Sequence, residues 1–293
     1  MGRFTGPPAL LAAALGLVAA GAAVFGLVHS ARALRGGGDP ARVTFADMLA
    51  TGQAAPGAAA AGTIDPDAID ALKRMGEYLR SLKAFQLKAD VTAEDVLQDG
   101  QKVQSTTAVD LLAEPPAHLR ADLVGDRRER LFLFDGKTFT LWAPSARYYA
   151  VVPAPGTIAK LADELEAKYD IELPLVDLFR WGTPESDIAD IQSATDLGPS
   201  QVEGVTCEHY AFRQQGLDWQ VWIQNGDYPL PRKLVLTTLT DEARPQHTSV
   251  YTWNLAPSYN DAAFAFTPPA DARKIGIAEV TAGGVLRTQE VQR

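Results

Sequence analysis

Hydrophobic residues recur along the chain at two different periods, which separate its predicted helices from its predicted strands. Between residues 66 and 83 they return every three or four positions, as on one face of a helix. The residues of this stripe are Ile69, Leu72, Met75, Leu79 and Leu82. Asp65 supplies an N-cap, and Pro66 suits the first helical position. The pattern predicts a helix over residues 66–83.

After this helix the period falls to two, which is typical of strands that bury one face. The first series of extended runs covers residues 85–97, 102–112, 118–124, 129–134, 137–142 and 147–152. The second series covers residues 188–194, 201–213, 217–224, 232–240, 247–255 and 263–267. The two series predict consecutive antiparallel strands.

A second helical segment separates the two series of strands. Ile158, Leu161, Leu165 and Tyr169 form one apolar stripe after Gly156, and residues 173–181 suggest a further, shorter turn of helix. The fold class is therefore α+β. We expect one curved antiparallel sheet of about eleven strands, an unclosed half-barrel, whose concave face is covered by two or three helices.

The dipeptide Asp135-Gly136 predicts a two-residue turn between two strands. Such a turn would place Phe132 opposite Phe139. It would also gather four large apolar side chains on one face of the sheet. These side chains are Phe132, Phe134, Phe139 and Leu141.

Gln215-Gly216 predicts a second two-residue turn, which places Phe212 opposite Trp219 and Arg213 opposite Asp218. This register pairs opposite charges on one face and collects an apolar group on the other. The apolar group consists of Tyr210, Phe212, Trp219, Val221 and Ile223.

The N-terminal region carries a targeting signal. A nearly continuous apolar stretch follows Arg3, and Ala31-Arg32-Ala33 fits a small-residue cleavage site, so residues 1–33 are predicted to be a signal peptide. The stretch is also long enough to cross a bilayer as a helix, which takes about 20 residues, so a retained membrane anchor is the alternative. Both interpretations imply that the rest of the chain is exported, and a bacterial periplasm is the expected location.

Composition divides the exported part into three regions. Residues 34–64 are rich in Ala and Gly and predict a flexible linker, because they have little apolar surface to bury. Residues 65–277 form the predicted folded domain, and residues 278–293 form a C-terminal tail. The formal charge of the 293-residue chain is -9, so no basic surface for nucleic acid is expected.

Several segments together resemble a domain-of-unknown-function family of predicted periplasmic proteins, similar in architecture to the LolA/LppX-type lipoprotein and lipid carriers. The resemblance spans about residues 65–277. The segments are residues 134–137, 204–213, 218–223, 229–233 and 264–269. The resemblance implies an unclosed half-barrel with helices in its concavity, and it supplies no catalytic residues.

The two apolar groups suggest the walls of a cavity for a lipid, a lipoprotein acyl chain or another hydrophobic ligand. The nine candidate lining residues are Phe132, Phe134, Phe139, Leu141, Tyr210, Phe212, Trp219, Val221 and Ile223. A purely structural core of aromatic residues is the competing interpretation. An interaction or sensor module that recognises another envelope protein is the alternative function.

Motifs for chemistry are sparse. The single cysteine, Cys207, shares a predicted strand face with His209, but no third group is identified for catalysis or metal binding. His118 and His247 are expected at the surface. We therefore predict a binding protein with no enzyme activity, no metal and no cofactor, and a hydrolase remains the distant alternative.

Overall fold

The computed structural model describes residues 62–183, 186–280 and 286–288. Three α-helices are present among them: α3 (Pro66–Ser81), α4 (Ile158–Tyr169) and α5 (Asp177–Arg180). Short 3-10 turns are η1 (Pro144–Ala146), η2 (Asp187–Asp190) and η3 (Asp261–Phe264). The expected signal peptide or anchor and most of the expected linker lie outside the described residues.

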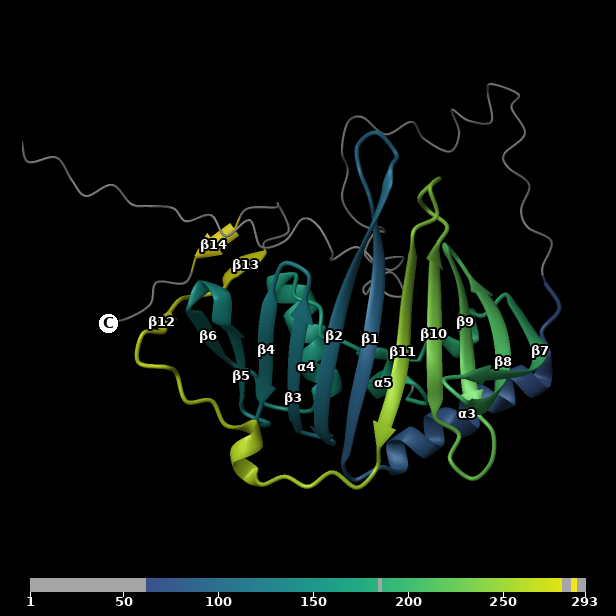
Figure 1. The fold of residues 1–293 in the computed structure, drawn as a ribbon, viewed down its shortest axis with the longest axis horizontal. Coiled ribbons are helices and arrows are strands. Elements are labelled where there is room, and N and C mark those ends of the chain that lie inside the picture. Colours follow the sequence, from purple (N-terminus) through teal and green to yellow (C-terminus); the bar gives the residue numbers. More distant parts are fainter. Residues whose placement is uncertain (1–61, 184–185, 281–285, 289–293) are drawn as a thin grey trace, which may run out of the picture.

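Twelve of the described strands form one long curved sheet, which Figure 1 shows from its outer side. The first six are β1 (Phe85–Val96), β2 (Lys102–Glu114), β3 (His118–Gly125), β4 (Glu129–Phe134), β5 (Thr138–Ala143) and β6 (Tyr148–Pro153). The next five are β7 (Ser193–Val202), β8 (Val205–Gln214), β9 (Leu217–Gln224), β10 (Pro231–Thr238) and β11 (Gln246–Asn254). The last are the short β12 (Arg273–Lys274), β13 (Ala278–Val280) and β14 (Leu286–Thr288).

The sheet consists of two meanders that join at its centre. Its 12 strands have the order β12-β6-β5-β4-β3-β2-β1-β11-β10-β9-β8-β7, and β13 and β14 form a separate pair. The pair β1–β11 links the two meanders, so β1 lies beside the last long strand of the chain. β7 and β12 are the two ends of the sheet, which is therefore an unclosed half-barrel as predicted.

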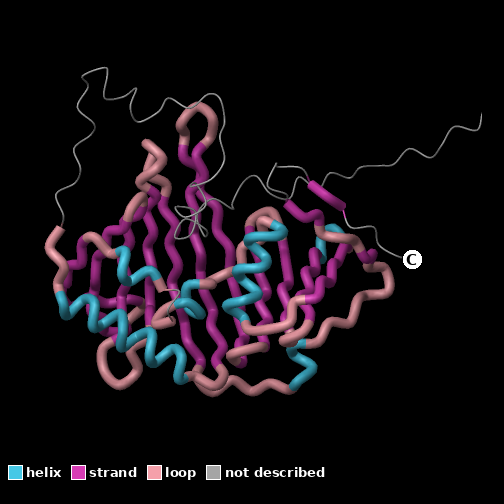
Figure 2. Tube along the Cα trace, turned by 180° about the vertical axis from the view of Figure 1, so that it is seen from behind, coloured by secondary structure: helices cyan, strands magenta, loops and turns pink. Residues whose placement is uncertain are grey.

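The helices cover the concave face, as Figure 2 shows from the other side. α3 begins where predicted, with the Asp65 carboxylate accepting a hydrogen bond of 2.9 Å from the amide of Asp67. Its buried face includes Leu72 and Met75 and lies on the half of the sheet that ends at β7. α4 lies on the other half, and its N-terminal Ile158 amide bonds to the Pro116 carbonyl at 2.8 Å.

One predicted register is confirmed and one is wrong. β8 and β9 pair as expected, with Phe212 opposite Trp219. In the β4–β5 hairpin, however, Phe134 lies opposite Phe139 because the loop has four residues rather than two. The shift equals two residues along one strand. The same four apolar side chains therefore still share a face.

Two predicted strand boundaries and one predicted strand are also wrong. Residues 187–190, where a strand was predicted to begin, form η2 instead. The predicted strand 201–213 is divided by a turn at Glu203 and Gly204, both with positive φ, so that its first two residues belong to β7 and the residues after the turn to β8. Residues 261–264 form η3 instead of a strand. The ring of Phe266 lies 5.9 Å from that of Trp142 and 5.3 Å from that of Tyr149, so this segment covers part of the outer face.

Candidate ligand-binding face

The nine predicted lining residues all belong to the concave side of the sheet. Eight of them are at most 7% exposed, and Leu141 is half-buried against the same apolar cluster. Phe212 stacks on Trp219 with ring centroids 4.2 Å apart, whereas Phe132 meets Phe139 edge-on at 5.6 Å. These aromatic rings are thus packed parts of the core in this structure.

The structure does not bring the two aromatic groups together. Five strands, β3, β2, β1, β11 and β10, separate β4 from β9. We call the β4–β5 end with α4 the first wing and the β8–β9 end with α3 the second wing. The candidate residues are therefore the two ends of one long apolar surface rather than facing walls.

The centre of the concave face is a region that the sequence interpretation missed. Leu87 of β1 and Leu111 of β2 are 0% exposed, and Val109 is 4% exposed. The signal for this region is the alternation of apolar and polar residues, which is clear in β1 and is interrupted in β2 by the adjacent Leu111 and Leu112. β1 and β2 provide an aliphatic floor between the aromatic wings.

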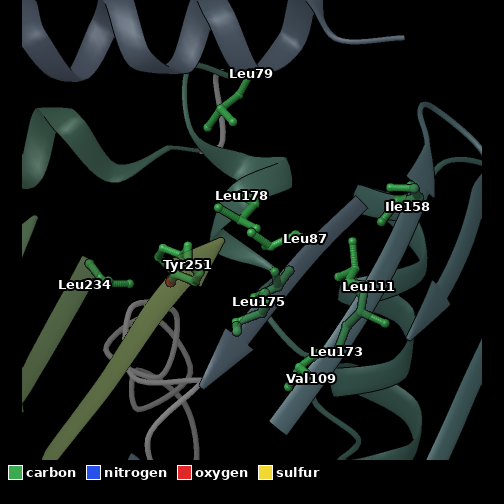
Figure 3. Packing of buried hydrophobic residues seen from close by; sticks show 14 of the residues in the cluster. Leu79, Leu87, Val109, Leu111, Ile158, Leu173, Leu175, Leu178, Leu234 and Tyr251 are labelled. Atoms are coloured by element: carbon green, nitrogen blue, oxygen red, sulfur yellow. The ribbon is translucent and has the colours of Figure 1, made fainter. Parts of the chain in front are cut away.

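Residues 171–182, which we call the strap, cover this floor. The strap follows α4 and includes α5, and Leu173, Leu175 and Leu178 are each at most 4% exposed. Figure 3 shows these three leucines grouped over β1, β2 and β11, with Leu178 and Leu175 close to Leu87. Only residues 177–180 of the predicted short helical segment form a helix, α5.

The backbone of the strap is unusual at Leu175, whose φ is 56°. A large side chain at positive φ is sterically disfavoured, and such conformations persist only where surrounding contacts impose them. Here the imposing contacts are the apolar ones of Leu173 and Leu178 on either side. The strap is therefore held in a backbone conformation that its own sequence does not favour.

Two contacts fix the far end of the strap. Arg180, which is 7% exposed, places its Nη2 atom 2.8 Å from Oδ1 of Asp163 and 3.6 Å from Oε2 of Glu166 on α4. On the other side, a Cβ atom at Gly76 of α3 would lie 2.7 Å from the Cα atom of Gly182. α3 and the end of the strap thus meet backbone to backbone, which only glycine permits.

A line of polar side chains runs along β11 beside the floor. His247 and Ser249 are 1% exposed and Tyr251 is 2% exposed. Nε2 of His247 lies 3.1 Å from Oγ of Ser249, and the Ser249 hydroxyl also bonds to the side chain of Tyr251. Burial raises the pKa of Tyr251 and lowers that of His247 to about 4, so both groups are uncharged near neutral pH.

The surface position expected for His247 is wrong. Its partner across the ladder is Leu236, which faces the core, and residues directly opposite share a face. The surface position was expected because His247 follows Pro245 near the start of a predicted strand. His118 is half-buried, and its ring lies 5.2 Å from that of Phe264.

Cys207 and His209 share the outer face of the sheet, as predicted, but each has separate partners. Cys207 is 0% exposed, and burial raises the pKa of its thiol. The His209 ring stacks on Trp222 at 3.8 Å, and its Nε2 lies 3.0 Å from Oε1 of Gln220. Packing and hydrogen bonding account for both side chains.

The outer face also carries a shallow depression of about 380 Å³ over β3, β2, β1 and β11. Asp90, Asp110, Asp122 and Glu203 contribute to its lining, with Lys88 as the one cation there. Asp122 is bound by Arg120 through contacts of 2.7 and 2.9 Å. No group of three or more His, Cys, Asp or Glu residues within the described ranges is placed to hold a metal ion.

The comparison with protein families decides the classification. Residues 68–278 match the model of a family described as "Predicted periplasmic protein (DUF2092)". The chain belongs to the DUF2092 family. This membership places the protein in the periplasm and agrees with the export predicted from its N-terminal segment. None of the helices in the described part of the chain is long and apolar enough to span a membrane.

Solved structures with a similar fold are remote in sequence. The lipoprotein LppX from Mycobacterium tuberculosis has 10% identity and a TM-score of 0.36, with 67% of this chain and 100% of LppX covered. LprF from Mycobacterium bovis has 13% identity and a TM-score of 0.39, with coverage of 72% and 100%. A LolA superfamily protein from Nitrosomonas europaea has 12% identity and a TM-score of 0.33, with coverage of 68% and 97%. Among curated proteins, no sequence matches this DUF2092 chain.

Proposed function

We propose that this DUF2092 protein is an exported binding protein that holds an acyl chain or a comparable hydrophobic ligand between its sheet and its helical cover. The observation that carries the proposal is the concave face itself. It is apolar from Phe139 at one wing to Phe212 at the other, apart from the polar line on β11. The nine predicted residues form the ends of the proposed binding surface.

The cover is suited to separate from the sheet. The strands are joined by ladders of backbone hydrogen bonds, whereas the backbone hydrogen bonds of the strap lie within the cover itself. Examples are the Ile171 amide to the Leu165 carbonyl at 3.1 Å and the Leu178 amide to the Leu175 carbonyl at 3.2 Å. Movement of the strap would therefore expose apolar surface without breaking the sheet. Burial of an acyl chain there contributes about 25 cal/mol per Å², before ordering costs.

Native mass spectrometry with lipid extraction tests this proposal on protein purified gently from the periplasm. We expect one lipid bound per chain. Delipidated protein should then bind the neutral fluorescent probe N-phenyl-1-naphthylamine saturably, and urea-unfolded protein serves as the control. An empty protein that also fails to bind the probe would contradict the proposal.

A second candidate function is recognition of an envelope protein through the β1–β2 hairpin. The ladder of β1 with β11 ends at Ala93, and that of β2 with β3 ends at Thr107, so the outer part of the hairpin projects beyond the sheet (Figure 1). Leu97 is 45% and Val103 is 36% exposed there. Open strand edges with apolar side chains suit pairing with an extended segment of a partner.

Capture from an envelope extract tests the second function. A single stoichiometric partner should be retained by the wild-type protein and lost by Leu97→Asp. Val124→Asp is the matched control, because Val124 is 55% exposed at a site away from the hairpin tip. Equal capture by all three proteins would exclude the hairpin as the contact.

A further inference from the structure

We propose that the centre of the concave face, beneath the strap, binds the acyl chain of an uncharged ester or alcohol. In this arrangement the strap occupies the site until the ligand replaces it, and the hydroxyls of Ser249 and Tyr251 hold the polar end of the ligand. This inference rests on the proposed binding function and names the site and the ligand class.

The strap resembles an acyl chain in what it presents to the sheet. Leu173, Leu175 and Leu178 place aliphatic side chains on a floor formed by Leu87 and Leu111, and all five are at most 4% exposed. The floor itself has no hydrogen-bonding side chain. A hydrocarbon chain can therefore replace the strap without leaving a polar group of the floor unsatisfied.

The backbone of the strap favours its release. Leu175 adopts a φ of 56°, which a leucine leaves readily once its side-chain contacts are lost. A ligand that takes over the apolar contacts on the floor relieves this strain. Binding is then an exchange between two occupants of one site, and the strap lowers the apparent affinity of the ligand.

The polar line on β11 determines the class of the ligand. The hydroxyls of Ser249 and Tyr251 can both donate and accept hydrogen bonds, as an ester or an alcohol requires. His247 at the end of the line is uncharged near neutral pH, because burial lowers its pKa to about 4. Arg180, the buried cation of the described core, is already neutralised by Asp163 and Glu166. A buried carboxylate or phosphate would lack a compensating charge here.

The strap is tested with monooleoylglycerol, whose dissociation constant is measured by displacement of N-phenyl-1-naphthylamine. Leu178→Ala weakens the strap but leaves the floor intact, so the ligand should bind about tenfold more tightly than to wild type. Leu217→Ala is the matched control, since Leu217 is 3% and Leu178 4% exposed and Leu217 belongs to β9. The control should lose stability similarly without binding more tightly.

The polar end is tested by Tyr251→Phe, which removes one hydroxyl and keeps the ring. Affinity for monooleoylglycerol should fall about five- to tenfold, while affinity for the hydrocarbon-like probe stays unchanged. Tyr169→Phe on α4 is the control. Oleate at neutral pH should bind at least about tenfold more weakly than monooleoylglycerol, because its carboxylate lacks a partner.

The outcomes separate this inference from the proposed function. If Leu178→Ala binds the ligand no more tightly than Leu217→Ala does, the strap does not occupy the site and the inference fails. If Tyr251→Phe and Tyr169→Phe bind monooleoylglycerol with equal affinity, the assignment of the polar end is wrong. If neither wild type nor any variant binds the probe or the lipid, the proposed function itself is wrong.

Discussion

The β4–β5 and β8–β9 hairpins stand at opposite ends of the sheet and both turn through a glycine with a φ of 80°, Gly136 and Gly216. Their loops nevertheless differ in length. In the first wing the strands pair across four loop residues, and in the second wing they pair across two. Similar dipeptides thus produced different registers.

Side chains beside each turn explain the difference. The Asp135 carboxylate accepts hydrogen bonds from the amides of Lys137 at 2.9 Å and Thr138 at 2.6 Å, and from the Thr138 hydroxyl at 3.1 Å. This satisfies the amides of a wider loop. In the second wing, Arg213 and Asp218 face each other through contacts of 2.6 and 2.7 Å and favour the shorter turn.

The largest effect is expected from a test of whether the wings share one core. Phe139→Ala in the first wing and Phe212→Ala in the second should each lower the free energy of unfolding by about 3–5 kcal/mol, because both side chains lie in one buried cluster. Urea unfolding followed by tryptophan fluorescence should show a single transition for both variants. Two separate transitions would show that the wings unfold independently.

An intermediate effect should distinguish the two turns. Asp135→Ala should lower the free energy of unfolding by about 1–2 kcal/mol, because it leaves the loop amides without an acceptor. Gln215→Ala, at the same position of the other turn, should change it by less than about 0.5 kcal/mol. Equal effects in urea titrations would remove Asp135 as the cause of the longer loop.

The effect of Asp135→Ala on the free energy of unfolding should depend on pH. Burial opposes ionisation of Asp135, but hydrogen bonds from Thr138 and Lys137 outweigh it and hold the pKa of its carboxyl below the ordinary value. Its contribution is present above the unfolded pKa of about 3.9 and is lost as the pH falls through the folded pKa. The stability difference between wild type and Asp135→Ala should therefore shrink at acidic pH.

The smallest effect is expected at the ion pair of the second wing. Arg213→Ala should cost no more than about 1 kcal/mol, because the Arg213 side chain is 46% exposed and water screens the pair. The loss should decrease further in about 1 M salt. A salt-independent loss would point to packing of the arginine stem instead of charge.

The face of each strand was more predictable from the sequence than its register. Alternation fixes which side chains point inward, and a shift by two residues leaves that set unchanged, as Phe132 and Phe139 illustrate. Loop length depends on side-chain hydrogen bonds such as those of Asp135, which propensity alone does not determine. The half-barrel was confirmed because it depends on the order of elements. The family resemblance, which rests on several short segments, was confirmed by the family match over residues 68–278.

The candidate site was less predictable, because it depends on packing between distant segments. The aromatic residues drew attention to the wings, whereas the centre is made of ordinary aliphatic positions such as Leu87. The strap has no repeating pattern, and its path depends on contacts with Asp163 on α4 and with Gly76 on α3, of which only α3 is far away in sequence. The buried position of His247 required the β10–β11 register.

The central pair β1–β11 has a consequence for the order of folding. Its residues, such as Leu87 and Trp253, are far apart in the sequence, so the middle of the sheet cannot close before the last long strand has emerged. Until then β1 and β10 are exposed edges, open to wrong pairing with other chains. A chain that crosses a membrane from its N-terminus must therefore be shielded until almost its whole length has been delivered.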